Sequence, residues 1–387
     1  MKLVIPKEIM EHERRVAATP DTVGKMVKKG IEVLVEAGAG LESSISDADY
    51  TAAGAKIVPT AEVLYGQADV VFKVQRPLQN AKLGRHEADL MKPGATLVSF
   101  LFPVQNADVV SRLAQKKVAA FAVDCIPRIS RAQSMDGLSS MSNLAGYKAV
   151  LLAANALGKI FPMMTTAAGT IYPSKVIIIG AGVAGLQACA QAKRMGAVVT
   201  VFDVRPVVAE QVKSLGCEFV PMDVPHDAQD AGGYAKELGA DFYKKEQEIV
   251  AKYSKDADVI ITTALIPGKR APILITEEMV KQMKMGSVIV DLSVEQKGNC
   301  ILSEPGQTVV KHGVTIIGIL NLPSMIPACA SQLYARNLLT FLNLAAPDGK
   351  EMKFDMNDEV IKGALITRNG EVLHPGVKEA LKKGGVA

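Results

Sequence analysis

Short apolar runs alternate with amphipathic stretches along the first third of the chain. The apolar runs are typical of buried strands, whereas the amphipathic stretches place apolar residues three and four positions apart, as helices do. The strand candidates are KLVIP, IEVLVEAGAG, DVVFKV, GATLVSFLF and VAAFAVDCI, and the helix candidates cover 21–30, 61–67 and 107–117. Strands that alternate with helices predict a parallel sheet covered on both faces. We therefore expect one α/β domain in this part of the chain.

The stretch from Ser139 to about Phe161 is largely apolar and predicts a long helix, suited to bridge two domains. A second series of strand candidates follows: KVIIIGAG, AVVTVFDV, ADVIITTAL, GSVIVDLS and VTIIGIL. Helices are expected up to Met195, over 209–215 and 277–283, and in PACASQLYARNLLTFLNLA. The tail after Met352 carries short strands such as ALITRNG, and we expect it to return to the first domain.

The predicted fold class is therefore α/β, with two doubly wound, parallel-sheet (Rossmann-like) domains joined by long helices. The first domain would be discontinuous, comprising 1–137 and 328–387. The second would comprise 138–327.

Composition narrows the function classes. The 387 residues suffice for two cores, and 49% hydrophobic with 22% charged residues is ordinary for a globular protein. Aromatic residues make up 5%, Trp is absent, and the net charge of +4 arises from charges that alternate along the chain, so nucleic acid is not expected as a partner. The five cysteines form no C-x-x-C pair, which predicts neither a disulfide framework nor a metal site and favours a reducing compartment.

Neither a signal peptide nor a membrane helix is expected. Pro6, Lys7 and Glu8 interrupt the N-terminus before an apolar segment could form. The longest uncharged stretch, 176–192, is near the lower length limit for a membrane span but contains three glycines and two glutamines. Any role at a membrane would therefore require a partner.

The motif Gly180-Ala181-Gly182-Val183-Ala184-Gly185 directly follows a predicted strand and opens a predicted helix. This is the context that dinucleotide binding requires, because the glycines allow a tight turn, close approach of the pyrophosphate and close helix packing. The simpler alternative is that these glycines only end a strand. Asp203 ends the next strand, 203 − 180 = 23 residues after the first glycine, where a carboxylate would accept hydrogen bonds from the adenosine ribose and favour NAD over NADP. Arg205 could either grip a 2′-phosphate or be a solvated turn residue.

Three segments carry a resemblance to a known family. The segment IPRISRAQSMDGLSSMSNLAGY, together with ITTALIPGK and AGGYAKE, resembles the NAD-binding domain of proton-translocating NAD(P) transhydrogenases. The likeness covers nearly the whole chain, from VIPKE to SQLYARNLL, and RISRAQSMD is highly specific to that family. The related alanine dehydrogenases share the fold and much of the sequence.

The loop residues are chemically suited to the roles that the resemblance implies. Arg128 can pair with a pyrophosphate or with the ribose next to the nicotinamide, Asp136 and Ser139 can hold the carboxamide, and Gln133 offers a donor and an acceptor to a second nucleotide. The loop falls between the two expected domains, where α/β proteins often bind ligands; without the resemblance it would pass for a surface loop with a helix cap at Ser139.

The glycine pair before Tyr234 resembles the family's mobile loop that closes over bound nucleotide, although a turn before the next helix would look the same. The candidate catalytic residues are Gln133, Arg128 and Asp136. The candidate cofactor-binding residues are Arg128, Ile129, Ser130, Arg131, Gln133, Asp136, Ser139, Gly180, Gly182, Val183, Gly185, Asp203, Val204, Arg205, Gly233, Tyr234, Ala264 and Leu265.

The alanine dehydrogenases are the main alternative. Arg15 and Lys73 match positions that bind the keto acid there, Phe102 stands where that family has its catalytic histidine, and Glu295 stands where it has an aspartate. Because a phenyl ring cannot exchange a proton, half of that acid–base site is lost. Arg15 and Lys73 are then expected at a domain interface.

The resemblance implies direct hydride transfer from NADH on this chain to NADP+ on a partner domain, coupled to proton translocation by a membrane component. It further implies NADP-binding and membrane-spanning partner subunits, a homodimer, and a position on the cytoplasmic (or matrix-equivalent) side of the inner membrane, peripheral through those partners. An amino-acid dehydrogenase and a noncatalytic NAD-binding module remain as alternatives.

Overall fold

The computed structural model describes residues 1–221, 240–265 and 270–383, and the chain divides into two compact units. Unit 1 comprises Met1–Met141 and Ser324–Ala387, and unit 2 comprises Ser142–Pro323. The divisions thus fall at 141 and 324, whereas the sequence suggested 137 and 328. Helix α6, Gly137–Ala156, runs through the first division without interruption, so no loop marks it.

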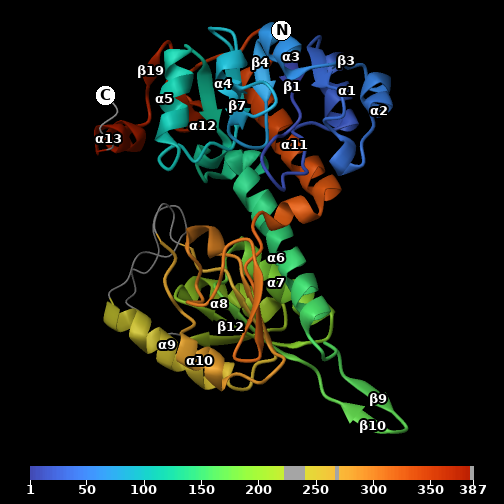
Figure 1. The fold of residues 1–387 in the computed structure, drawn as a ribbon, viewed down its shortest axis with the longest axis vertical. Helices are drawn as coiled ribbons and strands as arrows, with labels where there is room; N and C mark the ends of the chain where they lie inside the picture. Colours follow the sequence, from blue (N-terminus) through green and yellow to red (C-terminus); the bar gives the residue numbers. More distant parts are fainter. Residues whose placement is uncertain (222–239, 266–269, 384–387) are drawn as a thin grey trace. The chain divides into compact units, whose positions relative to one another are not determined.

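Unit 1 contains an eight-stranded sheet in the order β19-β18-β8-β7-β4-β1-β2-β3 (Figure 1). Neighbouring strands from β8 to β3 are parallel, and β18 and β19 are added in antiparallel fashion. The C-terminal tail therefore completes the sheet that the N-terminal third begins. The strands are β1 Lys2–Ile5, β2 Glu32–Glu36, β3 Lys56–Val58, β4 Val70–Phe72, β7 Thr96–Ser99, β8 Ala119–Ala122, β18 Leu365–Arg368 and β19 Glu371–Val372, with a separate small ribbon of β5 Gln79–Asn80 and β6 Arg85–His86.

Helices cover both faces of this sheet. One face packs with α3, α4, α5 and α13 around a buried cluster that includes Leu97 and Val110. On the other face, Phe341 of α11 packs edge-to-face on Phe121 of β8, with ring centroids 5.1 Å apart. Helix starts follow local capping rules, as at Ser46, whose hydroxyl accepts the Asp49 N–H. The helices are α1 Pro20–Lys28, α2 Asp47–Ala52, α3 Ala61–Gln67, α4 Glu87–Leu90, α5 Ala107–Gln115, α11 Pro327–Ala345, α12 Glu359–Ala364 and α13 Pro375–Lys383.

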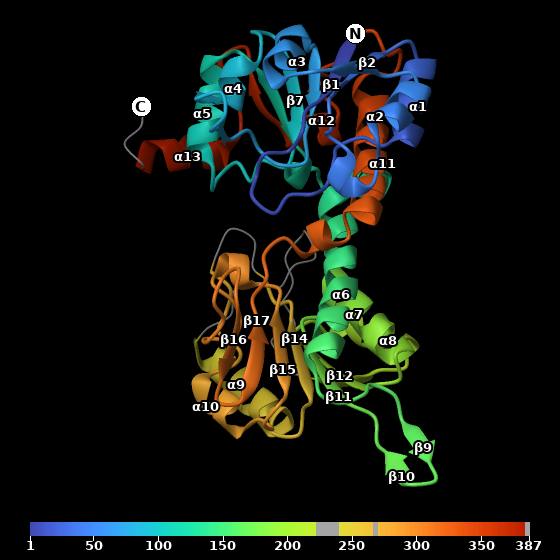
Figure 2. The same ribbon diagram turned by 45° about the vertical axis from the view of Figure 1, so that its right-hand side comes forward.

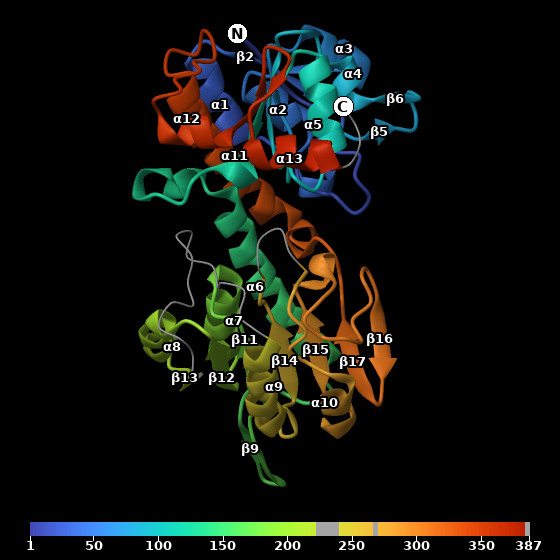
Figure 3. The ribbon, with the colours of Figure 1, turned by 90° about the vertical axis from the view of Figure 1, so that its left-hand side faces the viewer.

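Unit 2 contains a seven-stranded sheet in the order β13-β12-β11-β14-β15-β17-β16, which Figure 3 shows nearly face on. All neighbours are parallel except β16, which is antiparallel to β17. The order reverses between β11 and β14, and that switch point is where open α/β sheets bind ligands. The strands are β11 Lys175–Ile179, β12 Val198–Asp203, β13 Glu218–Pro221, β14 Val259–Thr262, β15 Val288–Asp291, β16 Thr308–Lys311 and β17 Val314–Ile317.

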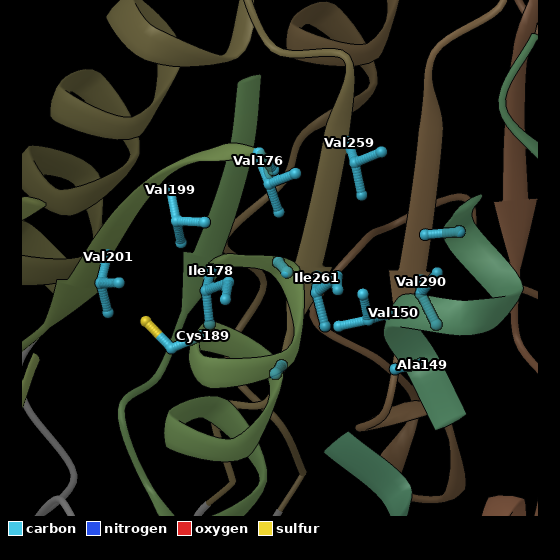
Figure 4. Close-up of a cluster of buried hydrophobic side chains, with 14 of the residues drawn as sticks. Ala149, Val150, Val176, Ile178, Cys189, Val199, Val201, Val259, Ile261 and Val290 are labelled. Atoms are coloured by element: carbon cyan, nitrogen blue, oxygen red, sulfur yellow. The ribbon is translucent and has the colours of Figure 1, made fainter. Parts of the chain in front are cut away.

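Alternate strand residues of unit 2 enter two separate cores. Val176 and Ile178 of β11 join α6, α7 (Val183–Arg194) and α8 (Ala209–Ser214) on one face (Figure 4), and Ile177 and Ile179 join α9 (Ala240–Ser254) and α10 (Glu277–Gln282) on the other. A strand that is buried on both faces has an uninterrupted run of apolar residues, as β11 has in VIII at 176–179. The predicted α/β fold class with two parallel-dominated sheets is confirmed.

The sequence patterns did not predict α9 or the hairpin of β9, Met164–Thr166, and β10, Gly169–Ile171. Figure 2 shows this hairpin standing out from the sheet of unit 2. All six of its strand residues are exposed, and polar and apolar residues do not alternate along its strands. A strand that packs on no core leaves no such alternation to detect.

Candidate functional site

The dinucleotide motif forms the turn between β11 and α7, at the switch point of the unit 2 sheet. Gly180 adopts φ +97°, a conformation that favours glycine, and its N–H donates to the Phe202 carbonyl at 2.8 Å. Its carbonyl accepts the hydroxyl of Thr263, which follows β14, at 2.9 Å. A Cβ on Gly185 would lie 1.8 Å from the Gly180 carbonyl oxygen, so only glycine fits there.

Gly182 is the N-cap residue of α7, and it differs from the other two glycines. A Cβ placed on it would meet nothing within 4 Å, and the following Val183 is 37% exposed. The first turn of α7 therefore faces open space, with N–H groups and a positive helix end available to an anion. This arrangement fits the pyrophosphate of a dinucleotide.

Asp203 ends β12 and is almost fully buried. Its carboxylate accepts the Ala181 N–H at 2.6 Å, the Arg205 N–H at 2.7 Å and the Arg205 Nε–H at 2.9 Å. Arg205 Nη2 lies 2.9 Å from the second oxygen, and its side chain is only 13% exposed. The arginine therefore lies folded against Asp203 instead of pointing into solvent. Val204 lies between them and is half-buried.

Glu246 is a buried carboxyl group that the sequence patterns did not single out. It lies on α9, is 4% exposed, and has its pKa raised to about 7 by burial and by the negative charge of Asp203. It shares the buried face of α9 with Val250. A carboxylate at a core-facing position of an amphipathic helix was the signal that could have revealed it.

Asn299 forms hydrogen bonds with Ala264 and Pro272, two residues that follow β14. The Asn299 side chain accepts the Ala264 N–H at 3.1 Å and donates to the carbonyls of Ala264 at 2.9 Å and Pro272 at 2.8 Å. Both predicted site residues after β14, Ala264 and Leu265, are half-buried. The amide thus connects Ala264 with Pro272 at the carboxyl edge of the sheet.

Unit 1 contains a cavity of about 360 Å³ formed by the RISRAQSMD loop and the start of α6. The loop folds into a 3-10 helix, Ser130–Met135. The cavity is lined by Pro127, Arg128, Ala132, Gln133, Asp136 and Ser139. Four predicted site residues, Arg128, Gln133, Asp136 and Ser139, therefore share one cavity within this unit.

Asp136 organises this cavity. Its carboxylate accepts the Ser139 N–H at 2.8 Å and the Ser139 hydroxyl at 2.6 Å, so Asp136 caps α6. The helix cap that the sequence suggested at Ser139 is thus three residues earlier, because Asp136 is the first side chain able to accept the free N–H groups. Arg128 Nε lies 3.9 Å from the same carboxylate. Gln133 is exposed.

Three other predicted loop residues do not line the cavity. Arg131 forms a two-pronged ion pair with Asp358, at 2.9 and 3.0 Å, and Ile129 and Ser130 lie outside the lining set. Gly233 and Tyr234 lie outside the described residues.

In the described ranges, no group of three or more His, Cys, Asp or Glu residues is arranged to hold a metal ion. The same ranges contain no helix that is both long enough and apolar enough to cross a membrane.

Comparison with known proteins decides the family. The model of the alanine dehydrogenase/PNT N-terminal domain matches residues 4–145, and that of the C-terminal domain matches 149–375. The chain belongs to the alanine dehydrogenase/PNT family. The first part of the NAD(P) transhydrogenase alpha subunit of Rhodospirillum rubrum is 53% identical over 380 residues, covering 97% of this chain and 99% of that protein. Alanine dehydrogenase of Methanococcus maripaludis is 32% identical over 388 residues, covering 98% and 96%.

Solved structures give the same family. The transhydrogenase from Sinorhizobium meliloti is 42% identical with a TM-score of 0.83, covering 97% of this chain and 99% of that chain. An L-alanine dehydrogenase is 26% identical with a TM-score of 0.82, covering 99% of each chain. Both branches of the family therefore share this backbone, and individual residues must distinguish them.

Two residues expected at a domain interface lie in the interior of unit 1. Lys73 is fully buried, with Nζ 2.9 Å from Glu87 and 3.1 Å from Glu8, and Arg15 donates to Glu13 through Nε at 2.7 Å. Although burial lowers the pKa of Lys73, the two carboxylates more than offset this and raise it. Both cations have carboxylate partners within unit 1, and their expected position at a domain interface stays a prediction.

Phe102, the residue that the sequence analysis set against the alanine dehydrogenases, also lies in unit 1. Phe102 is 40% exposed at φ +45°, and its ring stacks on Phe100 with centroids 6.0 Å apart. Its N–H donates to Asp124 at 2.9 Å. Glu295, in unit 2, accepts the Asn321 N–H at 3.2 Å. The structure therefore places a hydrocarbon ring, with no titratable atom, at position 102.

Proposed function

We propose that this chain is the NAD(H)-binding component of a proton-translocating transhydrogenase. The observation that carries this is Phe102, since a phenyl ring cannot serve as the acid or base that amino-acid oxidation needs. Hydride transfer between two nicotinamides needs no such group. Near full-length similarity to transhydrogenase alpha subunits, at 53% and 44% identity, supports the same choice.

Unit 2 would bind NAD(H) through the open first turn of α7. Gly182 leaves room for the pyrophosphate, and the buried carboxylate of Asp203 would face the ribose hydroxyls. NADP(H) would be disfavoured, because its 2′-phosphate would approach the negative charge of Asp203. Val183, Val204, Ala264 and Leu265 would contact the nucleotide through their backbone or apolar side chains.

The unit 1 loop would hold the reacting end of the nucleotide and present it to the partner. Arg128 would pair with phosphate or ribose oxygens, and Asp136 with Ser139 would hold the carboxamide. Gln133 has an exposed amide, and it would align the NADP(H) carried by the partner. When bound, NADH supplies a hydride to NADP+, and the residues of this chain supply position, which can lower a barrier by roughly 7 to 11 kcal/mol in favourable cases.

The partners would be an NADP-binding domain and a membrane-spanning component that couples transfer to proton movement. This chain would lie at the cytoplasmic or matrix-equivalent face of the inner membrane and attach through those partners. Their binding would complete the reaction site, since the hydride acceptor belongs to the partner.

A homodimer would use the β9–β10 hairpin. The hairpin exposes Met164 and Ile171 in its strands and Met163 and Tyr172 next to them, from 46% to 74%. Apolar side chains at that level of exposure on a two-stranded ribbon gain stability when a second copy covers them. A groove of about 530 Å³ in unit 2 would accept such a ribbon; it is lined by apolar residues and one lysine, namely Ala154, Leu157, Gly158, Lys159, Ile160, Phe161, Pro162 and Met195.

The test is NADH-dependent reduction of an NADP+ analogue, with and without a transhydrogenase NADP-binding domain. We expect transfer only with that domain, and no oxidation of alanine by NAD+ with the chain alone. Robust alanine turnover would instead establish an amino-acid dehydrogenase, for which the presence of Arg15 and Lys73 is the supporting observation. NADH binding without either activity would indicate a noncatalytic module.

A further inference from the structure

Two of the five free cysteines face each other in unit 2, outside the proposed nucleotide site. Cys189 lies in the middle of α7 and is fully buried, and Cys217 precedes β13 and is 6% exposed. Both belong to the core cluster beneath β11 and β12. Figure 4 shows the Cys189 sulfur directed from α7 toward Val201 of β12.

The two thiols interact directly through their side chains. Cys217 Sγ also lies 3.9 Å from the Cys189 carbonyl oxygen, so the sulfur lies against the backbone of α7 at that turn. Cys125, Cys300 and Cys329 lie on other elements, and Cys300 belongs to the core on the opposite face of the sheet. The arrangement is therefore a thiol pair and not an isolated buried cysteine.

The surroundings make the two thiols unequal. The hydrogen bond from Cys189, together with the nearby Lys193 ammonium, lowers the pKa of the Cys217 thiol, and the same hydrogen bond with burial raises the pKa of Cys189. Lys193 lies one turn beyond Cys189 on α7, and a Cβ on Gly216 would be 3.3 Å from its Cε and 4.0 Å from its Nζ. A thiolate beside a cation is the form that reacts with oxidants.

We propose that Cys189 and Cys217 form a reversible disulfide when the protein meets a hydroperoxide, with Cys217 as the attacking sulfur. The Cys217 thiolate attacks the terminal oxygen of the hydroperoxide, the O–O bond breaks, and the cysteine becomes a sulfenic acid. The other peroxide oxygen leaves and is protonated to an alcohol or to water. The Cys189 thiol then attacks the Cys217 sulfur, loses its proton and expels water. Two thiols are oxidised to one disulfide, and one peroxide bond is reduced.

The disulfide joins α7, whose first turn carries the dinucleotide loop, to the start of the edge strand β13. It closes a chain segment of 217 − 189 = 28 residues, and a cross-link of that length restricts the unfolded chain. Oxidised protein should therefore unfold at a higher temperature than reduced protein, and a reductant should reverse the shift. This inference does not depend on the proposed function, since it concerns only the residues of unit 2.

Peptide mapping of the full chain tests the proposal. After treatment with hydrogen peroxide, alkylation and tryptic digestion without reductant, we expect peptides 176–193 and 214–236 to be linked, with the loss of two hydrogen atoms. In Cys189→Ser, Cys217 should accumulate as a sulfenic acid that dimedone traps. Cys329→Ser, which removes an exposed thiol, should leave the link intact.

Lys193 provides a second test. Lys193→Gln should slow oxidation of Cys217 several-fold, whereas Arg194→Gln, which removes the adjacent exposed cation, should not. The proposal is overturned if wild-type protein oxidises Cys329 without linking the two peptides, or if dimedone marks Cys189 in Cys217→Ser but never Cys217 in Cys189→Ser. The wild-type experiment decides the question even where a variant fails to fold.

Discussion

Asp203 determines the proposed nucleotide preference at the level of a single residue. Its carboxylate is buried and already holds the Ala181 and Arg205 N–H groups, so its position is well defined. We expect the chain to bind NADH tightly and NADPH weakly. Asp203→Asn should reduce the difference between the two affinities, because it removes the negative charge that repels the 2′-phosphate. Calorimetric titration of both nucleotides measures it, with the exposed Asp256→Asn as the control. Equal affinities in the wild type would show that Arg205 leaves Asp203 and accommodates the 2′-phosphate.

Gln133 tests the proposed alignment role. Gln133→Asn shortens the side chain by one methylene, and a misplacement of about 1 Å can slow a reaction roughly a hundredfold. We therefore expect slow hydride transfer in stopped-flow measurements on the reconstituted complex, with NADH affinity and partner docking nearly unchanged. Ser134→Ala, at an exposed neighbouring position, should transfer normally, and Arg128→Ala should weaken NADH binding itself. A Gln133→Asn defect confined to NADH affinity would place this residue against NADH instead.

Glu246 should make the stability of unit 2 depend on pH. Burial raises its folded pKa to about 7 from an ordinary 4.5, so the folded state binds the proton more tightly. The resulting stabilisation is fully present below about pH 4.5 and is lost as the pH rises through about 7, with a total of about 3 kcal/mol at most. In urea unfolding, Glu246→Gln should lose less stability than the wild type between about pH 5 and about pH 8. Burial also raises the pKa of Glu8 in unit 1 to about 7, so part of the pH dependence of stability remains in the variant. The slope of the unfolding free energy against pH should therefore become smaller without reaching zero. An unchanged slope would mean that Glu246 is already charged in the folded protein.

At the scale of elements, the turn from β11 into α7 contains one glycine that the fold requires, Gly185, and another, Gly182, that we propose the ligand requires. A Cβ on Gly185 would collide with the Gly180 carbonyl oxygen, whereas a Cβ on Gly182 would enter open space. Gly185→Ala should lower the melting temperature markedly. Gly182→Ala should leave melting nearly unchanged but weaken NADH binding, because the added methyl occupies the approach to the helix N-terminus. Calorimetric melting and NADH titration of the two variants would separate these effects, and Gly182→Ala with full affinity would remove this turn from the proposed site.

Helix α6 shows how tightly the same turn is supported. Gly146 lies so close to α7 that a Cβ would be 2.0 Å from the Ala184 carbonyl oxygen. The absence of a side chain at Gly146 thus lets α6 approach α7 closely. The first turn of α7 therefore packs directly against α6. After β14, the side-chain amide of Asn299 connects Ala264 to Pro272 through hydrogen bonds to both residues.

At the scale of the whole molecule, the hairpin should control self-association. Replacing Met164 and Ile171 together by serine should shift the chain toward monomer in sedimentation velocity, because the apolar surface for a second copy is lost. Met285→Ser is the matched control, since Met285 is 89% exposed elsewhere on unit 2. A wild-type chain that is monomeric throughout the accessible concentration range would contradict the proposed homodimer.

Some features of this protein follow from the sequence alone because they depend on near neighbours. The alternation of apolar runs with helical periods predicted the two parallel sheets, and helix 61–67 has the predicted bounds. Gly180, Gly182 and Gly185 predicted a dinucleotide turn because the strand, turn and helix that it needs are contiguous, and the structure has that strand, turn and helix. The RISRAQSMD segment indicated the family for the same reason, as a short contiguous string.

Other features were decided only by tertiary structure, because they depend on residues far apart in the chain. Lys73 looks like a surface or interface lysine until folding brings Glu8 and Glu87 to its ammonium group. Cys189 and Cys217 are 28 residues apart in the sequence, and only folding brings them into one core cluster. Glu246 acquires its raised pKa only when α9 is buried near Asp203. In each case the sequence supplies the chemical group, but long-range packing chooses its partner and removes its water, and those two changes set its charge and reactivity.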